Sequence, residues 1–350
     1  MGREPASFSL TDSAHRGGKD ARPCVRRMIL LAILLCVASV ASSVAQAAQL
    51  LVVGAGSNNV VKFDIATGAS SLYANFPSAG GHSFPRELAM DEMGQVFAST
   101  ATRNRNVVKF VPQSGTDLKM AVDFTATVGE FGPGELQFYQ GDLYVAGGRE
   151  RAIIQFDGQT GAEIRRFSVT TSFNIRSLVI DGDELYYAEI FQDRVLKMDL
   201  TQAPPTGAAF FTDESNLNEP IAMAIGGNGN LFVTNRANTL VQEYDIETGG
   251  FVGTLVDLRS LNPVFFAQDA DIVYDAALDN YFVSAGNSVF RLSAQGALLQ
   301  TYQSDLLTNA YGILVIPEPH SFFLLCLGMA GLMVTRRCRR SWSHSTGATV

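Results

Sequence analysis

The chain repeats a four-strand pattern about every 45 residues, and this repeat restricts the fold more than any other feature. The clearest copy, residues 221–256, contains four short apolar runs separated by turns rich in Gly, Asn and Asp. Five further copies align with it, with successive spacings of 45, 47, 42, 46 and 50 residues. The aligned positions are Leu51, Val96, Leu143, Leu185, Leu231 and Tyr281. This period, with four strands per repeat, is typical of a β-propeller.

The two ends of the repeat array predict how the ring closes. The first copy, residues 49–76, lacks a first strand, whereas the apolar run Ala310–Ile316 follows the last complete copy. We expect this final run to complete the first blade. The sequence therefore predicts an all-β fold over residues 48–316, a six-bladed β-propeller closed by a C-terminal strand. An open solenoid would need capping repeats instead.

Charge and cysteine content exclude several classes of function. Residues 48–316 contain 16 Lys and Arg against 30 Asp and Glu, a net charge of about −14. A surface this acidic repels nucleic acid, so we expect no nucleic-acid partner. The four cysteines, Cys24, Cys36, Cys326 and Cys338, all lie outside this segment. The propeller therefore has no disulfide framework and no thiol chemistry, and depends on its apolar core.

The N-terminal segment, residues 1–47, has the three parts of a secretory signal peptide. Arginines at 22, 26 and 27 precede the apolar run Met28–Val40, and small residues follow up to Ala45 and Ala47. We predict a signal helix and cleavage after Ala47 or nearby. A permanent membrane anchor is the alternative. Thirteen apolar residues rise only about 20 Å as a helix, against roughly 30 Å of hydrocarbon, which favours cleavage.

The C-terminal segment, residues 317–350, also has three parts. Pro317, Glu318 and Pro319 precede the apolar run 321–334, and four arginines follow: Arg336, Arg337, Arg339 and Arg340. We expect an apolar helix that contacts the membrane, with the arginines on the cytoplasmic side. An ordinary tail anchor is the alternative interpretation of this pattern.

This tail resembles the PEP-CTERM sorting signal of exported bacterial proteins. The resemblance implies recognition by an exosortase-type membrane enzyme, transient retention in the membrane through the C-terminal helix, and cleavage near the motif. It also implies delivery to the cell surface or an extracellular matrix. The additional tail from Ser341 to Val350 departs from the pattern, because the signal usually ends soon after its arginines.

The propeller repeats resemble NHL-repeat and YVTN-type propellers. Segments 58–61, 106–108 and 194–196 carry the Asn or Arg before a Val-rich third strand that these families often show. Such propellers include binding platforms, lactone hydrolases and lyases, so the resemblance implies a fold and leaves the function open.

The loops that enter the innermost strands are expected to line the axial mouth of the ring. The candidate binding residues there are Arg86, Glu87, Glu135, Arg176, Glu219, Asp269 and Asn309. The four acids could converge and bind Ca²⁺ or Mg²⁺ through carboxylate oxygens, or the two arginines could pair with them. His82 is the only histidine between residues 48 and 316. No residue is assigned a catalytic role, and no resident cofactor is expected.

The leading hypothesis is an exported, non-catalytic binding or structural module of the cell surface. Its partner would be extracellular polysaccharide or another surface protein. The alternative is an exported metal-dependent hydrolase or lyase of the lactonase-like propeller type, which would use the acids of the axial mouth.

Overall fold

The computed structural model describes most of the propeller segment. The described residues are 48–76, 84–101, 106–114, 116, 118–128, 133–148, 151–169, 174–202, 208–212, 216–262 and 270–316. The predicted signal helix with Ala45 and Ala47, the candidate Asp269, and the predicted C-terminal helix with the sorting residues 317–340 lie outside them. Within the described ranges, no helix has the length and apolar character needed to cross a membrane.

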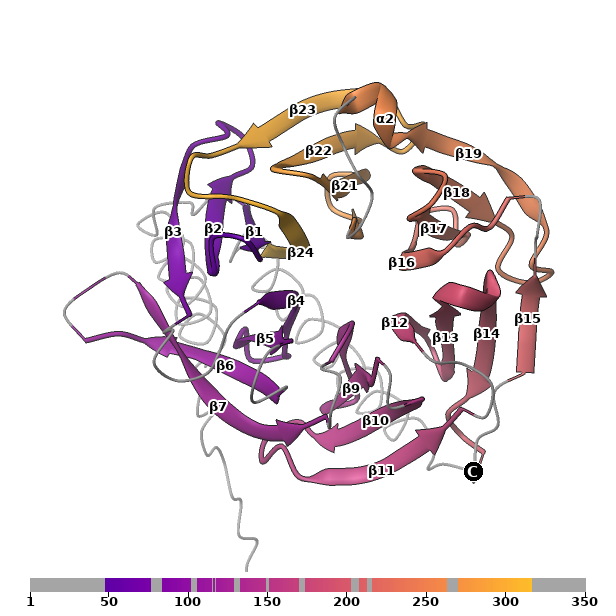
Figure 1. Cartoon of the computed structure of the whole chain (residues 1–350), viewed down its shortest axis with the longest axis horizontal. Helices are drawn as coiled ribbons and strands as arrows, with labels where there is room; N and C mark the ends of the chain where they lie inside the picture. Colours follow the sequence, from indigo (N-terminus) through magenta and orange to yellow (C-terminus); the bar gives the residue numbers. More distant parts are fainter. Residues whose placement is uncertain are drawn as a thin grey trace, which may run out of the picture. The chain divides into compact units, whose positions relative to one another are not determined.

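The strands form six four-stranded blades around one axis, as Figure 1 shows. The fold is therefore the predicted all-β six-bladed propeller. Blade 1 consists of β24 (Ala310–Ile316), β1 (Gln49–Gly54), β2 (Asn59–Asp64) and β3 (Ser70–Asn75). Blade 2 consists of β4 (Pro85–Met90), β5 (Val96–Thr100), β6 (Asn106–Pro112) and β7 (Lys119–Thr127). Blade 3 consists of β8 (Leu136–Tyr139), β9 (Asp142–Ala146), β10 (Ala152–Asp157) and β11 (Glu163–Ser168).

Blades 4 to 6 repeat the same antiparallel order from the axis outward. Blade 4 consists of β12 (Ile175–Asp181), β13 (Glu184–Glu189), β14 (Arg194–Asp199) and β15 (Ala208–Thr212). Blade 5 consists of β16 (Pro220–Ile225), β17 (Leu231–Asn235), β18 (Leu240–Tyr244) and β19 (Phe251–Asp257). Blade 6 consists of β20 (Ile272–Asp275), β21 (Asn280–Ala285), β22 (Ser288–Ser293) and β23 (Leu298–Gln303). Two short helices, η2 (Ile190–Gln192) and α2 (Leu258–Leu261), lie in the connections.

The predicted ring closure is present. Strand β24 pairs antiparallel with β1, from Gln49 opposite Ile316 to Gly54 opposite Ala310, with a bulge near Val52. Strands from the two ends of the propeller sequence thus share one sheet. The outer strand β3 also pairs in parallel with β7 through Ala74 and Asn75, so blades 1 and 2 form one eight-stranded sheet.

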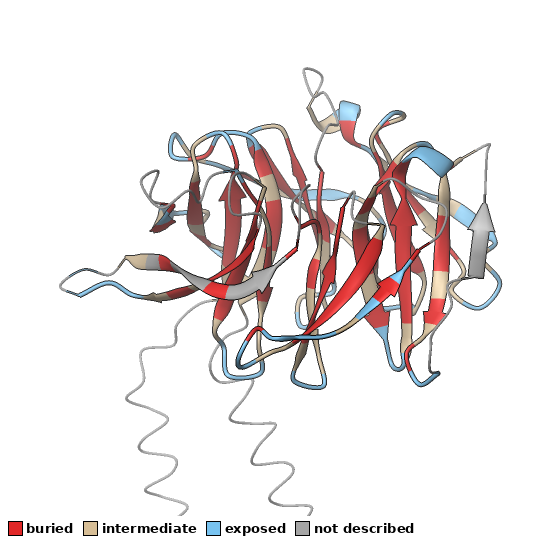
Figure 2. Ribbon diagram, turned by 60° about the horizontal axis from the view of Figure 1, so that its bottom comes forward, coloured by how far each residue is buried: buried red, intermediate tan, exposed pale blue. Residues whose placement is uncertain are grey.

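The core lies between blades rather than inside any one of them. Each of six buried apolar clusters joins two neighbouring blades. In Figure 2 the strands are mostly buried, and the exposed residues gather in the turns and outer strands. The second strand of each blade is covered on both sides, so β17 is buried along its whole length. This explains why the second strands are nearly all apolar.

The turns after the third strands end in glycine and share one backbone geometry. Gly68, Gly161 and Gly249 have φ values of 74°, 72° and 71°, a region that favours glycine. In each turn an aspartate closes the loop. The Asp157 Oδ1 atom accepts hydrogen bonds from the backbone N–H and the hydroxyl of Thr160, each at 2.7 Å, and Asp64 and Asp245 make the same contacts.

Candidate functional site

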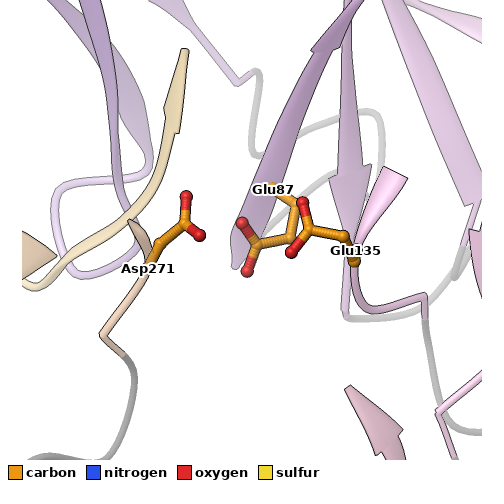
Figure 3. Close-up of side chains that lie close together, drawn as sticks. All are labelled: Glu87, Glu135 and Asp271. Atoms are coloured by element: carbon orange, nitrogen blue, oxygen red, sulfur yellow. The ribbon is translucent and has the colours of Figure 1, made fainter. Parts of the chain in front are cut away.

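Three carboxylates from separate blades meet near the axis of the ring. Glu87 lies on β4, Glu135 precedes β8 directly, and Asp271 precedes β20 directly. One oxygen atom of each carboxylate lies within 4.8 Å of the other two. In Figure 3 the three side chains point toward one another, with Glu87 between the other two. We call these residues the axial carboxylate cluster.

The cluster forms because its members occupy the same register position in three blades. Each acid is followed by an aliphatic residue of the innermost strand: Leu88, Leu136 and Ile272. Those residues pair with Ala98, Val145 and Val283, which all lie two residues after the aligned repeat positions. Blades 4 and 5 place Ser177 and Ala222 at the corresponding position, so neither contributes an acid there.

Hydrogen bonds hold Asp271 and Glu135 in place. Asp271 is 4% exposed, and its two oxygen atoms accept bonds from the backbone N–H groups of Ile272 (2.7 Å) and Ile313 (2.8 Å). The backbone of Glu135 donates to the Arg176 carbonyl at 2.9 Å. These contacts link the inner strands of neighbouring blades and so set the positions of the acids.

Glycines allow close approach around the cluster. A Cβ atom on Gly312 would lie 2.4 Å from the Arg86 carbonyl oxygen and 2.7 Å from Oε2 of Glu87. The closing strand β24 therefore runs directly against β4 because residue 312 has no side chain. On the other side of the cluster, Gly134 similarly abuts the backbone of Arg176.

The electrostatics of the cluster disfavour three negative charges. Burial raises the pKa of Asp271 to about 6, although the backbone N–H groups of Ile313 and Ile272 oppose the shift. Burial also raises the pKa of Glu135 well above its usual range, and the nearby charges of Glu87 and Asp271 add to the effect. Arg176 lowers this pKa only in part. The cluster therefore favours either a bound proton or a bound cation.

A hard divalent cation suits this set of oxygen atoms. Calcium takes six to eight oxygen ligands at about 2.3–2.6 Å, and magnesium takes six at about 2.0–2.1 Å. Glu87, Glu135 and Asp271 could hold such an ion and would leave part of its coordination sphere for water or a ligand.

An axial cavity of about 440 Å³ reaches the cluster at Glu135 and extends along the inner strands. This volume lies within the range of small-molecule sites, roughly 300–1,000 Å³. The lining near the cluster is buried, as at Leu136 and Ile272, whereas Met90, Phe138 and Tyr274 further along the strands are partly exposed. The cavity thus opens at the turn face, which we define as the side where turns join the first strand of each blade to the second.

The walls of the cavity offer backbone polar groups as well as aromatic side chains. Each innermost strand is hydrogen bonded to a neighbour on one side only. Its other row of backbone groups faces the axis, and Gln137 binds part of this row by accepting from the Ile180 N–H at 2.8 Å. Phe138 and Tyr274 lie at equivalent positions nearer the opening, opposite Leu143 and Tyr281. A polar ligand could find both hydrogen bonds and flat apolar surfaces here.

The other predicted site residues in the described ranges are not members of the cluster. Glu219 is outside the cluster and forms an ion pair with Arg236, with Oε2 2.7 Å from the arginine Nε. Asn309 is exposed in the loop before β24, where its backbone N–H donates to Asn287. Arg86 lies on β4 beside Glu87, and Arg176 lies on β12 near Glu135.

Sequence reasoning missed Asp271. The prediction named Asp269, two residues earlier, as the acid entering blade 6. An acid followed by an aliphatic residue, in or directly before the first strand of a blade, recurs at 87–88, 135–136 and 271–272. This repeated pair is the signal that could have identified Asp271.

Comparisons with known proteins agree with this description. Residues 315–340 match the family model of the PEP-CTERM protein-sorting motif. The chain therefore carries this motif at its C-terminus, as the resemblance predicted, and the motif indicates an exported protein that is processed at the membrane. No curated protein matches the sequence.

Among solved structures, three chains can be compared with this one. One is a chain of a nidogen–laminin complex, with 13% identity, 77% of this chain and 98% of that chain covered, and a TM-score of 0.60. Another is a protein of unknown function from Bacteroides caccae, with 12% identity, 77% and 99% coverage, and a TM-score of 0.56. A catalytically inactive virginiamycin B lyase from Staphylococcus aureus, solved with quinupristin, has 10% identity, 63% and 70% coverage, and a TM-score of 0.45. At these identities, the first two similarities show the fold alone.

Proposed function

We propose that the chain is an exported, non-catalytic binding module that recognises a surface polysaccharide through its axial cavity. The observation that carries this proposal is the meeting of Glu87, Glu135 and Asp271 at the inner end of that cavity. The sorting motif supports a place of action outside the cytoplasm.

A cation at the cluster would connect the protein to the sugar. Three carboxylates leave open coordination positions on a calcium ion, and sugar hydroxyl or carboxylate oxygens are suitable ligands for them. Backbone groups of the inner strands would bind further hydroxyls, and the rings of Phe138 and Tyr274 would cover an apolar sugar face. Without the cation, the cluster would repel an acidic polysaccharide.

The test is a glycan array probed with the protein in calcium and again in chelator. Retention in calcium, loss in chelator and loss in Glu135→Gln are the expected results. Glu219→Gln is the matched control, because it removes a carboxylate from the same ring but outside the cluster. Binding to a surface protein and to no glycan would mean that the partner is a protein. Glycan binding that is insensitive to chelator would mean that the cluster is not part of the binding site.

The same cluster favours a second candidate, a metal-dependent hydrolase or lyase. A carboxylate with a raised pKa, such as that of Glu135, can act as a general acid or base. Release of new reducing ends or unsaturated products from a polysaccharide, dependent on added metal, would support this candidate. If the melting temperature does not change across calcium and magnesium titrations, both the enzyme and the cation-bridged binding module lose their support.

A further inference from the structure

The wall of the axial cavity is a closed ring of strands. Its lining residues come from all six innermost strands, which are β4, β8, β12, β16, β20 and β24. Each of these strands contacts both of its neighbours around the axis (Figure 1). Among the described residues the wall is therefore continuous, and a ligand reaches the interior along the axis.

Specific contacts hold the innermost strands together. Gln137 on β8 accepts a hydrogen bond of 2.8 Å from the backbone of Ile180 on β12, and Asp271 accepts one from the backbone of Ile313 on β24. Between β24 and β4, Gly312 lies so close to the backbone of Arg86 that a Cβ atom would not fit. A ligand that entered from the side would have to separate these strands.

The axial carboxylate cluster lies deep inside this ring. Four residue steps lead from Glu135 to Tyr139, where β8 ends, and four lead from Asp271 to Asp275, where β20 ends. At about 3.3 Å per step, the cluster lies about 13 Å below the turn face. Spread over about 13 Å, the cavity volume of about 440 Å³ corresponds to a mean width of about 7 Å. The cavity is thus about twice as deep as it is wide.

An internal segment of a long polymer does not fit such a cavity. A chain that lies across the opening stays about 13 Å from the cluster. A chain that folds back on itself must place two passes side by side. Even two extended peptide backbones need about 5 Å each, and sugar rings are bulkier. A single chain end, in contrast, can enter along the axis and reach the cluster.

We infer that the axial cavity recognises the end of a polysaccharide chain and not its internal residues. The kind of ligand rests on the proposed function, and the mode of entry rests on the closed ring of strands. Oxygen atoms of the terminal sugar would complete the coordination of a cation at the cluster. The next sugar would lie beside Phe138 and Tyr274, nearer the opening.

End recognition has a consequence for the number of protein molecules that one polysaccharide chain holds. The two ends of a linear chain differ chemically, so a site that recognises one of them binds each chain once. The protein would then cap polysaccharide chains rather than coat them. Its amount in a matrix would follow the number of chains and not their length.

Chain length tests this inference directly. The protein is titrated in calcium, by calorimetry, with polygalacturonate, alginate and hyaluronate, each in two size fractions that differ about tenfold in length. We expect one protein molecule per chain in both fractions, with the same Kd per mole of chains. Binding to internal residues would instead place about tenfold more protein on the longer chains, and this result would overturn the inference.

A variant that fills the cavity provides a second test. Ile225 lines the cavity on β16 and is partly exposed, so Ile225→Trp adds a bulky ring inside a space about 7 Å wide. The affinity for the short fraction should fall at least about tenfold. Ile164→Trp is the matched control, because Ile164 is 51% exposed on the outer strand β11. Unchanged affinity in an Ile225→Trp protein that melts normally would overturn the inference, and if this variant does not fold, the chain-length titration of the unaltered protein decides.

The same titrations separate this inference from the proposed function. Calcium-dependent binding that increases with chain length would leave the binding module in place and remove end recognition. Absence of binding to all three polysaccharides, in both size fractions, would count against both.

Discussion

The backbone N–H of Ile313 donates a hydrogen bond of 2.8 Å to Oδ2 of Asp271. Ile313 belongs to β24, the strand that closes the ring, and Asp271 belongs to the axial carboxylate cluster. The last strand of the propeller thus completes both the first blade and the candidate site. Because β24 is the final described element, the site can form only after the whole propeller sequence is available.

Truncations on either side of this strand should therefore differ sharply. A chain that ends at Ile316 keeps every contact of β24 and should melt at the same temperature as a longer chain. A chain that ends at Asn309 loses the pairing with β1 and exposes Leu50, Val52 and their neighbours in the apolar cluster between blades 6 and 1. We expect it to lose cooperative unfolding. Thermal unfolding followed by circular dichroism checks both, and similar melting of the two chains would contradict the role of β24.

Gly312→Val should destabilise the protein and disturb the cluster. Its Cβ atom would lie 2.6 Å from Cα of Glu87, a contact that only a backbone shift can relieve. Overpacking of this kind costs about 1–3 kcal/mol, or more when backbone must move. Gly253→Ala is the control, because a Cβ atom at Gly253 meets nothing within 4 Å. Urea unfolding measures the difference, and equal stability of the two variants would show that β24 can shift without cost.

The stability should fall as pH rises from about 4 to 6 in the presence of chelator. Asp271 has a folded-state pKa of about 6, raised from 3.8, so the folded state holds its proton over this range and the unfolded state does not. The loss should be on the order of 3 kcal/mol, and Asp271→Asn should flatten this part of the profile. Urea unfolding at each pH measures it. A rise in stability over the same range would mean that Asp271 is ionised with a partner.

The aspartates of the Gly-ended turns should have the opposite pH dependence. Hydrogen bonds from Thr160 hold the pKa of Asp157 below its usual range. The stability they contribute is present above the unfolded-state pKa and is lost as pH falls through the folded-state pKa. Asp157→Ala should therefore lower the melting temperature at pH 7, and the difference should shrink in acid. A difference that stays constant with pH would show that the carboxylate charge is unimportant in this turn.

Removing the ion pair between Glu219 and Arg236 should have little effect. Their side chains are 28% and 31% exposed, and surface pairs of this kind contribute about 0.2–1 kcal/mol. Glu219→Gln should lower stability by no more than this and leave calcium binding unchanged, as measured by titration calorimetry. A large loss of calcium affinity would place Glu219 in the cation site and contradict the separation described above.

The fold could be predicted from the sequence because its determinants are local and repeated. Strand length, turn chemistry and the missing first strand of blade 1 are all visible between residues 49 and 316. A glycine such as Gly249 marks its turn because a positive φ is needed at that one position. Ring closure could be predicted by counting strands, because the first repeat lacks a first strand and one strand remains after the last complete repeat.

The site could be predicted only in part. Glu87 and Glu135 were identified as loop acids near the axis, but their partner Asp271 was replaced by Asp269. Both aspartates precede the first strand of blade 6, and the repeat pattern does not distinguish them; Asp269 lies outside the described residues. Glu219, at a similar sequence position, instead meets Arg236, and no local pattern distinguishes the two outcomes.

The sequence by itself determined the blades, their order and the strand that closes them, because hydrophobic periodicity and turn residues act over a few neighbours. It also determined the sorting motif, which is recognised by its composition and order. Only the tertiary structure decided that Glu87, Glu135 and Asp271 meet, and that the first and last described strands pair beside the cavity. Those relationships depend on distances across the ring between residues far apart in the chain, and packing between blades sets such distances.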